Sequence, residues 1–210
     1  MYDNKVPRRT AAAAAATRRD LIDAALSVFA ESGFPNATLE AIAERAGVTR
    51  GALYHHFGSK EDIYDVALAQ IADQVMQPLG AALAGEGPPL QRIHRFVESY
   101  CVALGTDDVF RQAVSLLLAG APTEHSRQRT GRGFVAFLAA FESVLRQAAE
   151  SGDLRAGLSP RSAAVSVLAC AVGVTASSLQ SPELISPEVE ARALADSLVA
   201  GLSSRPTSGD

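Results

Sequence analysis

Residues 38–60 read TLEAIAERAGVTRGALYHHFGSK, and the organisation of the whole chain follows from this segment. Thr38 is a good N-cap, and apolar residues follow it at helical spacing. Gly47 ends this first helix, because glycine readily takes the left-handed conformation. Thr49 then caps a second helix over residues 50–56. Two short helices joined by a tight glycine-containing turn are typical of a helix-turn-helix, whose second helix enters the major groove of DNA.

The outer side of the second helix carries residues that packing alone does not explain. Gly51 lies in its first turn, although glycine within a helix costs about 1 kcal/mol relative to alanine. The missing side chain lets the backbone approach another surface, such as DNA. Arg50, Tyr54 and His55 project from the same side with hydrogen-bonding ends. The sequence SKED that follows fits a capping box for a third helix and places Lys60 beside this surface.

These motifs resemble a known family. Residues 17–68, TRRDLIDAALSVFAESGFPNATLEAIAERAGVTRGALYHHFGSKEDIYDVAL, are similar to the N-terminal domain of TetR-family transcriptional regulators. The resemblance covers about a quarter of the chain. Within that family, VTRGALYHHFGSKEDI most resembles the AcrR-like repressors of efflux and stress genes. The resemblance implies a repressor that binds double-stranded DNA.

The resemblance also implies roles for individual residues. Arg50, Gly51 and His55 would face base edges, with Arg50 best suited to guanine. Family positions that hold phosphates are matched by Thr38, Thr49, Tyr54, His56 and Lys60. For His56 the alternative is to pack inward beside Phe57.

Composition sets bounds on the class of protein. The chain has 210 residues, 48% of them hydrophobic, which is enough for a sizeable core. No run approaches the roughly 18 apolar residues of a membrane span. Six alanines come after Arg8 and Arg9, but they do not indicate a signal peptide, because such a core is too short and too weakly apolar. We therefore expect a cytoplasmic protein without a membrane partner.

Net charge is −4, so composition alone does not indicate a nucleic-acid binder. Basic residues dominate up to residue 19, whereas residues 20–70 are acidic on balance. A DNA surface must therefore rely on where its few cations lie. Residues 1–16 are expected to form a disordered arm. Its arginines either reach into a minor groove or belong to a solvated tail.

The predicted fold class is all-α. Residues 17–77 form the three-helix DNA-binding domain, with the third helix running from Ser59 to Gln77 and interrupted by Pro78. Residues 78–203 form a larger helical domain for effector binding and dimerisation, because no segment there shows strand alternation. Residues 204–210 are expected to be a disordered tail.

Aromatic residues recur on helical faces of the second domain. They are Phe96, Tyr100, Phe110, Phe134, Phe137 and Phe141. Such a stripe is either core or the wall of a ligand pocket. A pocket of this kind would suit a small, largely apolar effector. Gly131 and Gly133 predict a break near the start of the aromatic helix.

The last two predicted helices point to a homodimer. Residues 160–179 are apolar nearly all round and rich in small residues, so they must be covered on all sides. Residues 188–202 supply a second apolar stripe. We therefore expect a homodimer through residues 160–202 that binds a near-palindromic operator.

The sequence contains no arrangement of residues typical of an enzyme, and we expect no cofactor and no metal site. His55 and His56 are adjacent on a helix and point about 100° apart, so they cannot share an ion without a further ligand. Cys101 and Cys170 lie in apolar helices. They are interpreted as small buried hydrophobes, with a redox-sensing pair as the alternative.

Two function classes follow from these observations. The first is a ligand-responsive transcriptional regulator, a repressor released from its operator by a small, largely apolar effector. The second is a helical binding or interaction protein whose helix-turn-helix unit is only structural. Binding to DNA from the region upstream of the protein's own gene distinguishes the two.

Overall fold

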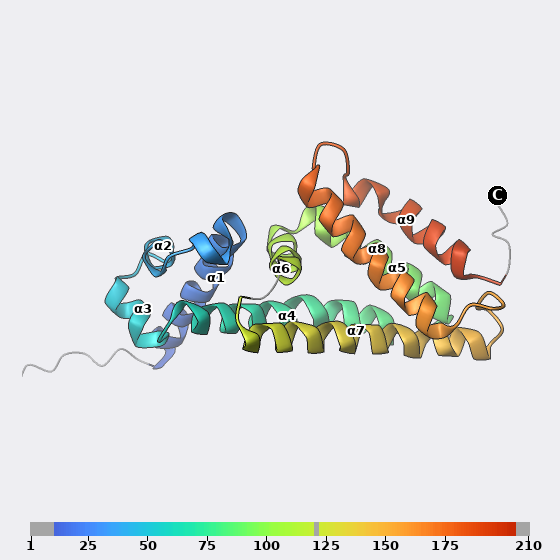
Figure 1. The fold of residues 1–210 in the computed structure, drawn as a ribbon, viewed down its shortest axis with the longest axis horizontal. Coiled ribbons are helices and arrows are strands. Elements are labelled where there is room, and N and C mark those ends of the chain that lie inside the picture. Colours follow the sequence, from blue (N-terminus) through green and yellow to red (C-terminus); the bar gives the residue numbers. More distant parts are fainter. Residues whose placement is uncertain (1–10, 120–121, 205–210) are drawn as a thin grey trace, which may run out of the picture. The chain divides into compact units, whose positions relative to one another are not determined.

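The computed structural model describes residues 11–119 and 122–204, without the side chains of residues 71–78 and 129. Within these ranges the chain is built from helices, and no strand is present (Figure 1). The helices are α1 (Ala11–Asn36), α2 (Leu39–Arg45), α3 (Arg50–His56), α4 (Lys60–Ala84), α5 (Pro89–Thr106), α6 (Asp108–Leu118), α7 (Glu124–Glu150), α8 (Pro160–Gln180) and α9 (Pro187–Leu202). The predicted all-α class is confirmed.

The helices form two compact units, Met1–Ala69 and Gln70–Asp210. The division falls inside α4, whereas the sequence predicted domains over residues 17–77 and 78–203. Helix α4 therefore contributes residues to both units.

Helix α4 continues through Pro78 to Ala84, which corrects the expectation of an interruption there. Proline removes one backbone hydrogen bond from a helix and costs about 3 kcal/mol. The turn that follows buries Leu79 and Leu83 almost completely, and this burial favours a continuous helix.

The turn between α2 and α3 is a Schellman motif. Gly47 has φ +65° and its N–H donates to the carbonyl of Glu44 at 3.0 Å. The N–H of Val48 donates to the carbonyl of Ala43, also at 3.0 Å. Only glycine takes this backbone conformation without strain, so the turn is tight and its direction is set.

Helix α1 begins earlier than the sequence suggested. Residues 11–16, expected within a disordered arm, form its first turns, while residues 1–10 lie outside the described residues. Alanine has the highest helix propensity, and adding residues to an existing helix is easier than nucleating one. At the other end, Gly33 has φ +71° and kinks the chain before residues 34–36.

The first unit has a small core shared by its helices. Its fully buried side chains are Leu21, Ile22, Ala25, Phe29, Ile42, Leu53 and Ile63. A bidentate ion pair joins α2 to α1. The two Nη atoms of Arg45 lie 2.5 and 2.7 Å from the two carboxylate oxygens of Glu31. Because Leu53 points inward, the opposite side of α3 is left facing outward.

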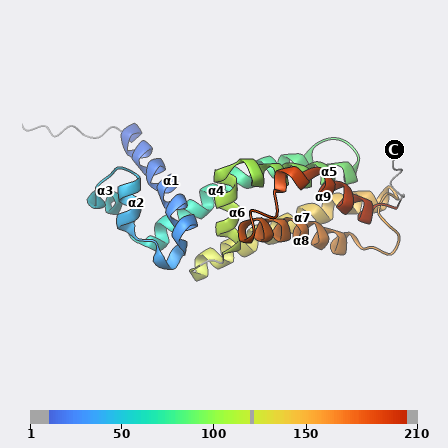
Figure 2. The ribbon, with the colours of Figure 1, turned by 90° about the horizontal axis from the view of Figure 1, so that it is seen from above.

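Helix α5 is central to the second unit, where it packs against α6, α7, α8 and α9 (Figures 1 and 2). Its buried side chains are Leu90, Ile93, Phe96, Val97, Tyr100, Cys101 and Leu104. These positions recur every three or four residues, so they share one broad face of the helix, and Phe96 lies inside the core. A helix with neighbours on several sides buries a wide apolar stripe.

Helix α7 is unbroken, which corrects the break predicted at its glycines. Gly131 and Gly133 are exposed within it, and neither has a positive φ. Thr123 caps the helix and forms a capping box with Ser126. A glycine weakens a helix by about 1 kcal/mol but does not end one that is capped and packed.

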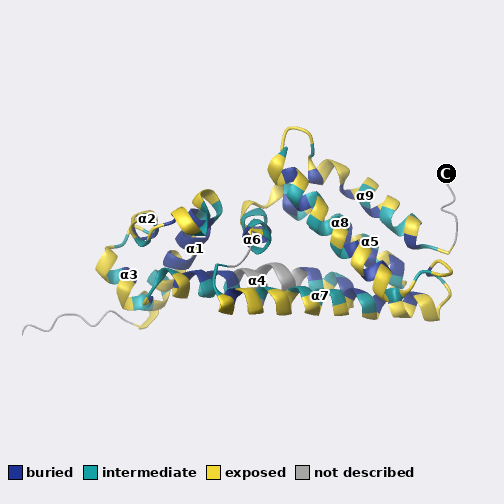
Figure 3. Ribbon diagram, viewed as in Figure 1, coloured by how far each residue is buried: buried dark blue, intermediate teal, exposed yellow. Residues whose placement is uncertain are grey.

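Helices α8 and α9 include many exposed residues (Figure 3). Some of them are apolar: Val165 is 48% exposed, Leu179 39% and Val189 73%. By length and composition alone α8 is apolar enough to cross a membrane, yet only 33% of its most apolar window is buried within the protomer. The second unit therefore does not cover this helix on all sides.

The end of the chain is held against the loop after α7. Ser204, expected in a disordered tail, donates its N–H to the carbonyl of Asp153 at 2.8 Å and its hydroxyl to that of Gly152 at 2.8 Å. These partners lie far away in sequence, so no local pattern indicates them. The rest of the expected tail, residues 205–210, lies outside the described residues.

A buried hydroxyl pair joins α5 to α8, and its two members should contribute unequally to stability. Thr175 donates to the carbonyl of Ala171 at 2.8 Å, so Tyr100 is the donor in the 2.6 Å contact between the two hydroxyls. Thr175→Val strands the buried tyrosine hydroxyl and should cost about 1–3 kcal/mol, whereas Tyr100→Phe should cost about 1 kcal/mol. Urea unfolding measures both values, and a larger loss for Tyr100→Phe would contradict this assignment.

Candidate functional site

The exposed face of α3 consists of the residues that the sequence singled out. Arg50, Gly51, Tyr54 and His55 are exposed, while Leu53 is buried. Positions i, i+1, i+4 and i+5 share one side of a helix, so the four residues form one surface. This surface, called here the α3 face, offers hydrogen-bonding groups around a position without a side chain.

Among the described residues, no contact requires glycine at position 51. A Cβ placed there would meet only the Thr49 hydroxyl, at 4.0 Å, and the backbone is helical. The glycine therefore lowers helix stability without relieving any internal clash. The absent side chain leaves the backbone of the α3 face open to close approach from outside.

Arg50 is held in place on the α3 face. Its Nη1 lies 2.5 Å from Oε1 of Glu40 on α2, and its Nη2 donates to the Tyr54 hydroxyl at 3.3 Å. The guanidinium also lies over the Tyr54 ring, 5.5 Å from its centre. The hydrogen bond with Tyr54 and the charge of Glu40 raise the pKa of Arg50, so this side chain stays cationic.

Thr38 and Thr49 cap α2 and α3 from exposed positions. Each hydroxyl oxygen accepts from a backbone N–H of its own helix, from Ala41 at 3.1 Å and from Ala52 at 3.2 Å. The cap uses an acceptor site only, so each hydroxyl proton can still be donated to an external oxygen. Both threonines thus stabilise the motif and offer a donor at a helix start.

The two histidines at the end of α3 differ in burial. His55 is exposed, whereas His56 is half-buried with its ring centre 6.5 Å from that of Phe57. The sequence left two positions open for His56, outward or packed inward beside Phe57. In the structure its side chain lies between these two, partly exposed and partly packed. Among the described residues, no group of His, Cys, Asp and Glu side chains is placed to hold a metal ion.

The ammonium of Lys60, predicted to contact a DNA phosphate, binds backbone carbonyls of its own unit. Its ammonium donates to the carbonyls of Phe34 at 2.8 Å, Ala37 at 3.0 Å and Pro35 at 3.4 Å. It also lies 4.4 Å from the centre of the Phe34 ring. The three protons of the ammonium are directed at the turn before α2, so this side chain holds the turn against the start of α4.

Two residues near the α3 face were not found by sequence reasoning. Arg18 of α1 places its guanidinium 5.2 Å from the ring centre of Phe57, at the end of α3. Glu40 pairs with Arg50 across two helices. Arg18 belongs to the basic residues that dominate up to residue 19, so a signal for it was present. No local pattern connects Glu40 with a residue ten positions later.

The six aromatic residues expected to line a ligand pocket are mostly packed against one another. Phe96 contacts Tyr100 and Phe141 with ring centres 6.0 and 4.8 Å apart, and Tyr100 contacts Phe110 at 5.3 Å. These four side chains are buried. Phe137 joins the cluster from a half-buried position, and Phe134 is also half-buried. The stripe is therefore chiefly core, because facing rings fill the space between α5, α6 and α7.

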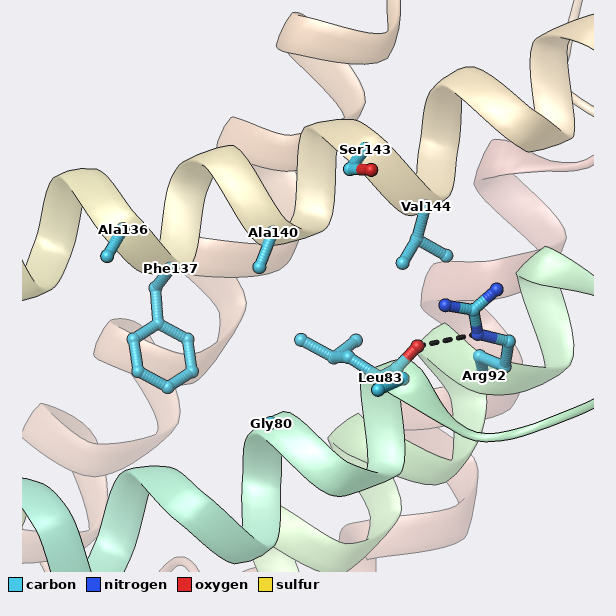
Figure 4. Close-up of a pocket in the computed structure, with 9 residues that line it drawn as sticks. Gly80, Leu83, Arg92, Ala136, Phe137, Ala140, Ser143 and Val144 are labelled. Atoms are coloured by element: carbon cyan, nitrogen blue, oxygen red, sulfur yellow. Dashed lines mark hydrogen bonds between the residues drawn. The ribbon is translucent and has the colours of Figure 1, made fainter.

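An open pocket of about 350 Å³, called the cavity below, lies beside this core (Figure 4). Of the six aromatic residues, only Phe137 is among the residues that line it in the described part of the chain. The lining is contributed by the end of α4, the start of α5 and the middle of α7: Gly80, Leu83, Ala84, Arg92, Ala136, Phe137, Ala140, Ser143 and Val144. Arg92 is the charged member of this set.

The two cysteines are placed as apolar side chains. Cys101 is buried and Cys170 is half-buried. Burial raises the pKa of Cys101 to about 11, with a smaller contribution from the neighbouring Cys170, and burial also raises the pKa of Cys170. Both thiols are therefore protonated at neutral pH, which disfavours the redox alternative.

Comparisons of sequence place the chain among bacterial regulators. The family profile of the bacterial regulatory proteins of the tetR family matches residues 21–67. The repressor BepR of Brucella suis biovar 1 (strain 1330) is 33% identical over 177 residues, or 79% of this chain and 82% of BepR. The uncharacterised regulator TtgW of Pseudomonas putida is 55% identical over 62 residues, or 30% of this chain. The chain spans only 46% of the length of TtgW.

The fold is shared with a solved repressor. SmeT, the repressor of the Stenotrophomonas maltophilia multidrug efflux pump SmeDEF, superposes with a TM-score of 0.75 at 29% identity, covering 90% of this chain and 92% of SmeT. A complex of SmeT with triclosan matches with a TM-score of 0.74 at 31% identity, over the same shares of the two chains.

The position of Lys60 predicts a loss of stability when its ammonium is removed. Lys60→Met should lower the free energy of unfolding by about 2 kcal/mol, because three carbonyls lose a charged donor. The salt dependence of DNA binding should stay unchanged, since the ammonium is already occupied. Arg19→Met is the matched control: it removes a charge from an exposed position of α1 and should change stability by less than about 0.5 kcal/mol. Wild-type stability together with a salt slope reduced by about one would instead make Lys60 a phosphate contact.

Proposed function

The chain belongs to the TetR family of bacterial regulatory proteins, and from this premise we propose that it is a ligand-responsive transcriptional repressor. It binds a near-palindromic operator as a homodimer, and a small, largely apolar effector releases it. The observation that carries the proposal is the α3 face, where an exposed glycine that no internal contact requires lies beside a fixed arginine.

In the proposed complex α3 lies in the major groove. Arg50 reads guanine, His55 reaches a neighbouring base edge, and Gly51 lets the backbone come close. Oxygens of the DNA backbone are held by the hydroxyls of Thr38, Thr49 and Tyr54, with His56 beside them. Lys60 acts indirectly, because it holds the turn that leads into α2.

Glu40 gives the α3 face a second property. A carboxylate beside Arg50 repels DNA phosphates, so a non-specific complex gains little from this arginine. In a specific complex, two hydrogen bonds to guanine replace the ion pair, which is exposed and therefore weak. Glu40 thus favours discrimination between sequences over affinity.

The experiment that tests the function is footprinting on DNA from the region upstream of the protein's own gene. A repressor dimer should protect two related half-sites separated by whole turns of the double helix. Equal binding to this DNA and to random DNA at moderate salt would leave the helix-turn-helix with a structural role only.

Arg50→Ala should weaken binding to the footprinted site by roughly 1–3 kcal/mol and affect random DNA much less. Glu40→Gln should act in the opposite sense, raising the affinity for random DNA because a negative charge is removed from the α3 face. Titrations on both DNAs at several salt concentrations measure the two effects. If Arg50→Ala weakens both complexes equally, Arg50 contacts only phosphates.

We propose that α8 and α9 form the dimer interface, through residues 160–202. Support comes from the exposed apolar side chains of these helices and from the small residues along α8, which allow two helices to approach closely. A partner protomer would cover the face of α8 that its own unit leaves open. Burial in a dimer interface also explains why α8 is as apolar as a membrane-spanning helix, so no membrane is needed to cover it.

For the effector we propose the cavity lined by α4, α5 and α7. Binding of triclosan by SmeT supports a mid-sized apolar ligand for this chain. The same α4 that begins at Lys60, in the DNA-binding unit, ends at Ala84 in the lining of the cavity. A ligand must prefer the state that cannot bind the operator, and shifting the population from 1:99 to 99:1 takes about 5.5 kcal/mol of preference. Operator DNA should weaken ligand binding by the same factor.

Gly173→Glu should convert the protein into monomers. A Cβ at this exposed position of α8 meets no atom of its own protomer within 4 Å, so the isolated chain tolerates a side chain there. A charge in the middle of a close helix crossing is not tolerated. Gly133→Glu on α7 is the matched control, because its Cβ also meets nothing within 4 Å. Sedimentation should give a dimer for the wild type and for Gly133→Glu; a dimeric Gly173→Glu places the interface elsewhere.

A further inference from the structure

We propose that the cavity between α4, α5 and α7 takes an amphiphile with one acidic group, whose carboxylate is held by Arg92 and whose apolar body extends toward Phe137. The inference rests on the proposed function for its regulatory meaning, since it names the chemical class of the effector. It adds a specific requirement, a negative charge, to a ligand described so far only as small and largely apolar.

Arg92 is fixed by two neutral acceptors. Its Nε donates to the carbonyl of Leu83 at 2.6 Å, and its Nη1 donates to Oε1 of Gln147 at 2.9 Å. These bonds tie the guanidinium to the end of α4 and to α7 at once. A guanidinium has five N–H donors in a rigid plane, so donors remain after these two bonds are made.

The positive charge of Arg92 is not balanced by a nearby carboxylate among the described residues. Other arginines of the second unit, such as Arg111, Arg127 and Arg146, form ion pairs with carboxylates. Arg92 is half-buried, and both of its acceptors are uncharged. A partly desolvated cation beside a cavity attracts an anion strongly, and a bidentate carboxylate matches the guanidinium in geometry.

The rest of the lining specifies the body of the ligand. Phe137 and Arg92 lie at opposite ends of the cavity in Figure 4, with Leu83 and Ala140 between them. The wall between the two ends is therefore apolar, and Ser143 adds one hydroxyl. A volume of about 350 Å³ is at the lower end of the range for small-molecule sites. An aryl or alkyl chain with a terminal carboxylate matches this distribution of polarity.

The test compares acids with their uncharged isosteres on the full-length protein. Calorimetry measures the affinity for hydrocinnamate and decanoate and for the corresponding primary amides. At neutral pH each acid is ionised, and each amide has nearly the same size and apolar body. We expect each acid to bind roughly tenfold or more tightly than its amide, because a charge-assisted pair with Arg92 is lost in the amide.

Arg92→Gln should abolish the preference for the acid while leaving the affinity for the amide within about twofold. Arg95→Gln is the matched control, because Arg95 lies one turn away on α5, is exposed, donates to the backbone carbonyl of Glu86 and does not line the cavity. It should keep the preference. Arg92→Lys retains the charge without the planar fork and should keep part of it.

Three results overturn the inference: equal affinity of acid and amide for the wild type, a preference that survives in Arg92→Gln, or no binding of either acid at millimolar concentration. The first and third need no variant, so they hold even if Arg92→Gln does not fold. Footprinting of the same preparation without ligand separates the two proposals. Operator binding with no acid binding retains the regulator and rejects the acidic ligand, whereas acid binding without any operator binding rejects the regulator alone.

Discussion

The positive φ of Gly47 is the constraint on which the DNA-binding unit depends. It allows the chain to leave α2 and enter α3 within a few residues, while the two amides of the Schellman turn still find acceptors. Thr49 then begins α3 at once, so Leu53 reaches the core and the opposite side faces outward. Replacing this turn by a longer one would rotate α3, and its exposed and buried faces would no longer match the sequence.

In this acidic protein, the placement of single arginines matters more at α3 than net charge. Arg50 pairs with Glu40 and lies over the ring of Tyr54, and Arg18 lies over the ring of Phe57 at the end of α3. Each arrangement uses an aromatic ring to orient a guanidinium that would otherwise sample many rotamers. These contacts restrict the two guanidinium groups before DNA binds, although in the proposed complex Arg50 exchanges its ion pair with Glu40 for a base.

Sequence reasoning worked where the determinants are local. The caps, the glycine turn and the exposed residues of α3 all follow from neighbouring positions, and so does the helical class. It did not indicate the bonds of Lys60 to backbone carbonyls, because these acceptors come within reach only when the kink at Gly33 brings residues 34–37 to the start of α4. Periodicity found the aromatic stripe but could not separate core from pocket, since both need an apolar face. Arg92 resembles Arg95 in sequence, and only tertiary contacts make them different.

The two ends of α4 are held in the same chemical manner, each within its own unit. At the start, the ammonium of Lys60 binds the carbonyls of the turn before α2. At the end, the guanidinium of Arg92 binds the carbonyl of Leu83, where a helix terminus has unsatisfied acceptors and favours a cation. Pro78 removes one hydrogen bond from the helix between these two points, so bending there is less costly than elsewhere. An acidic ligand acts on Arg92, the side chain that holds the last turn of α4. Such a ligand changes operator binding only if it binds Arg92 more tightly in one conformation of the last turn of α4 than in another.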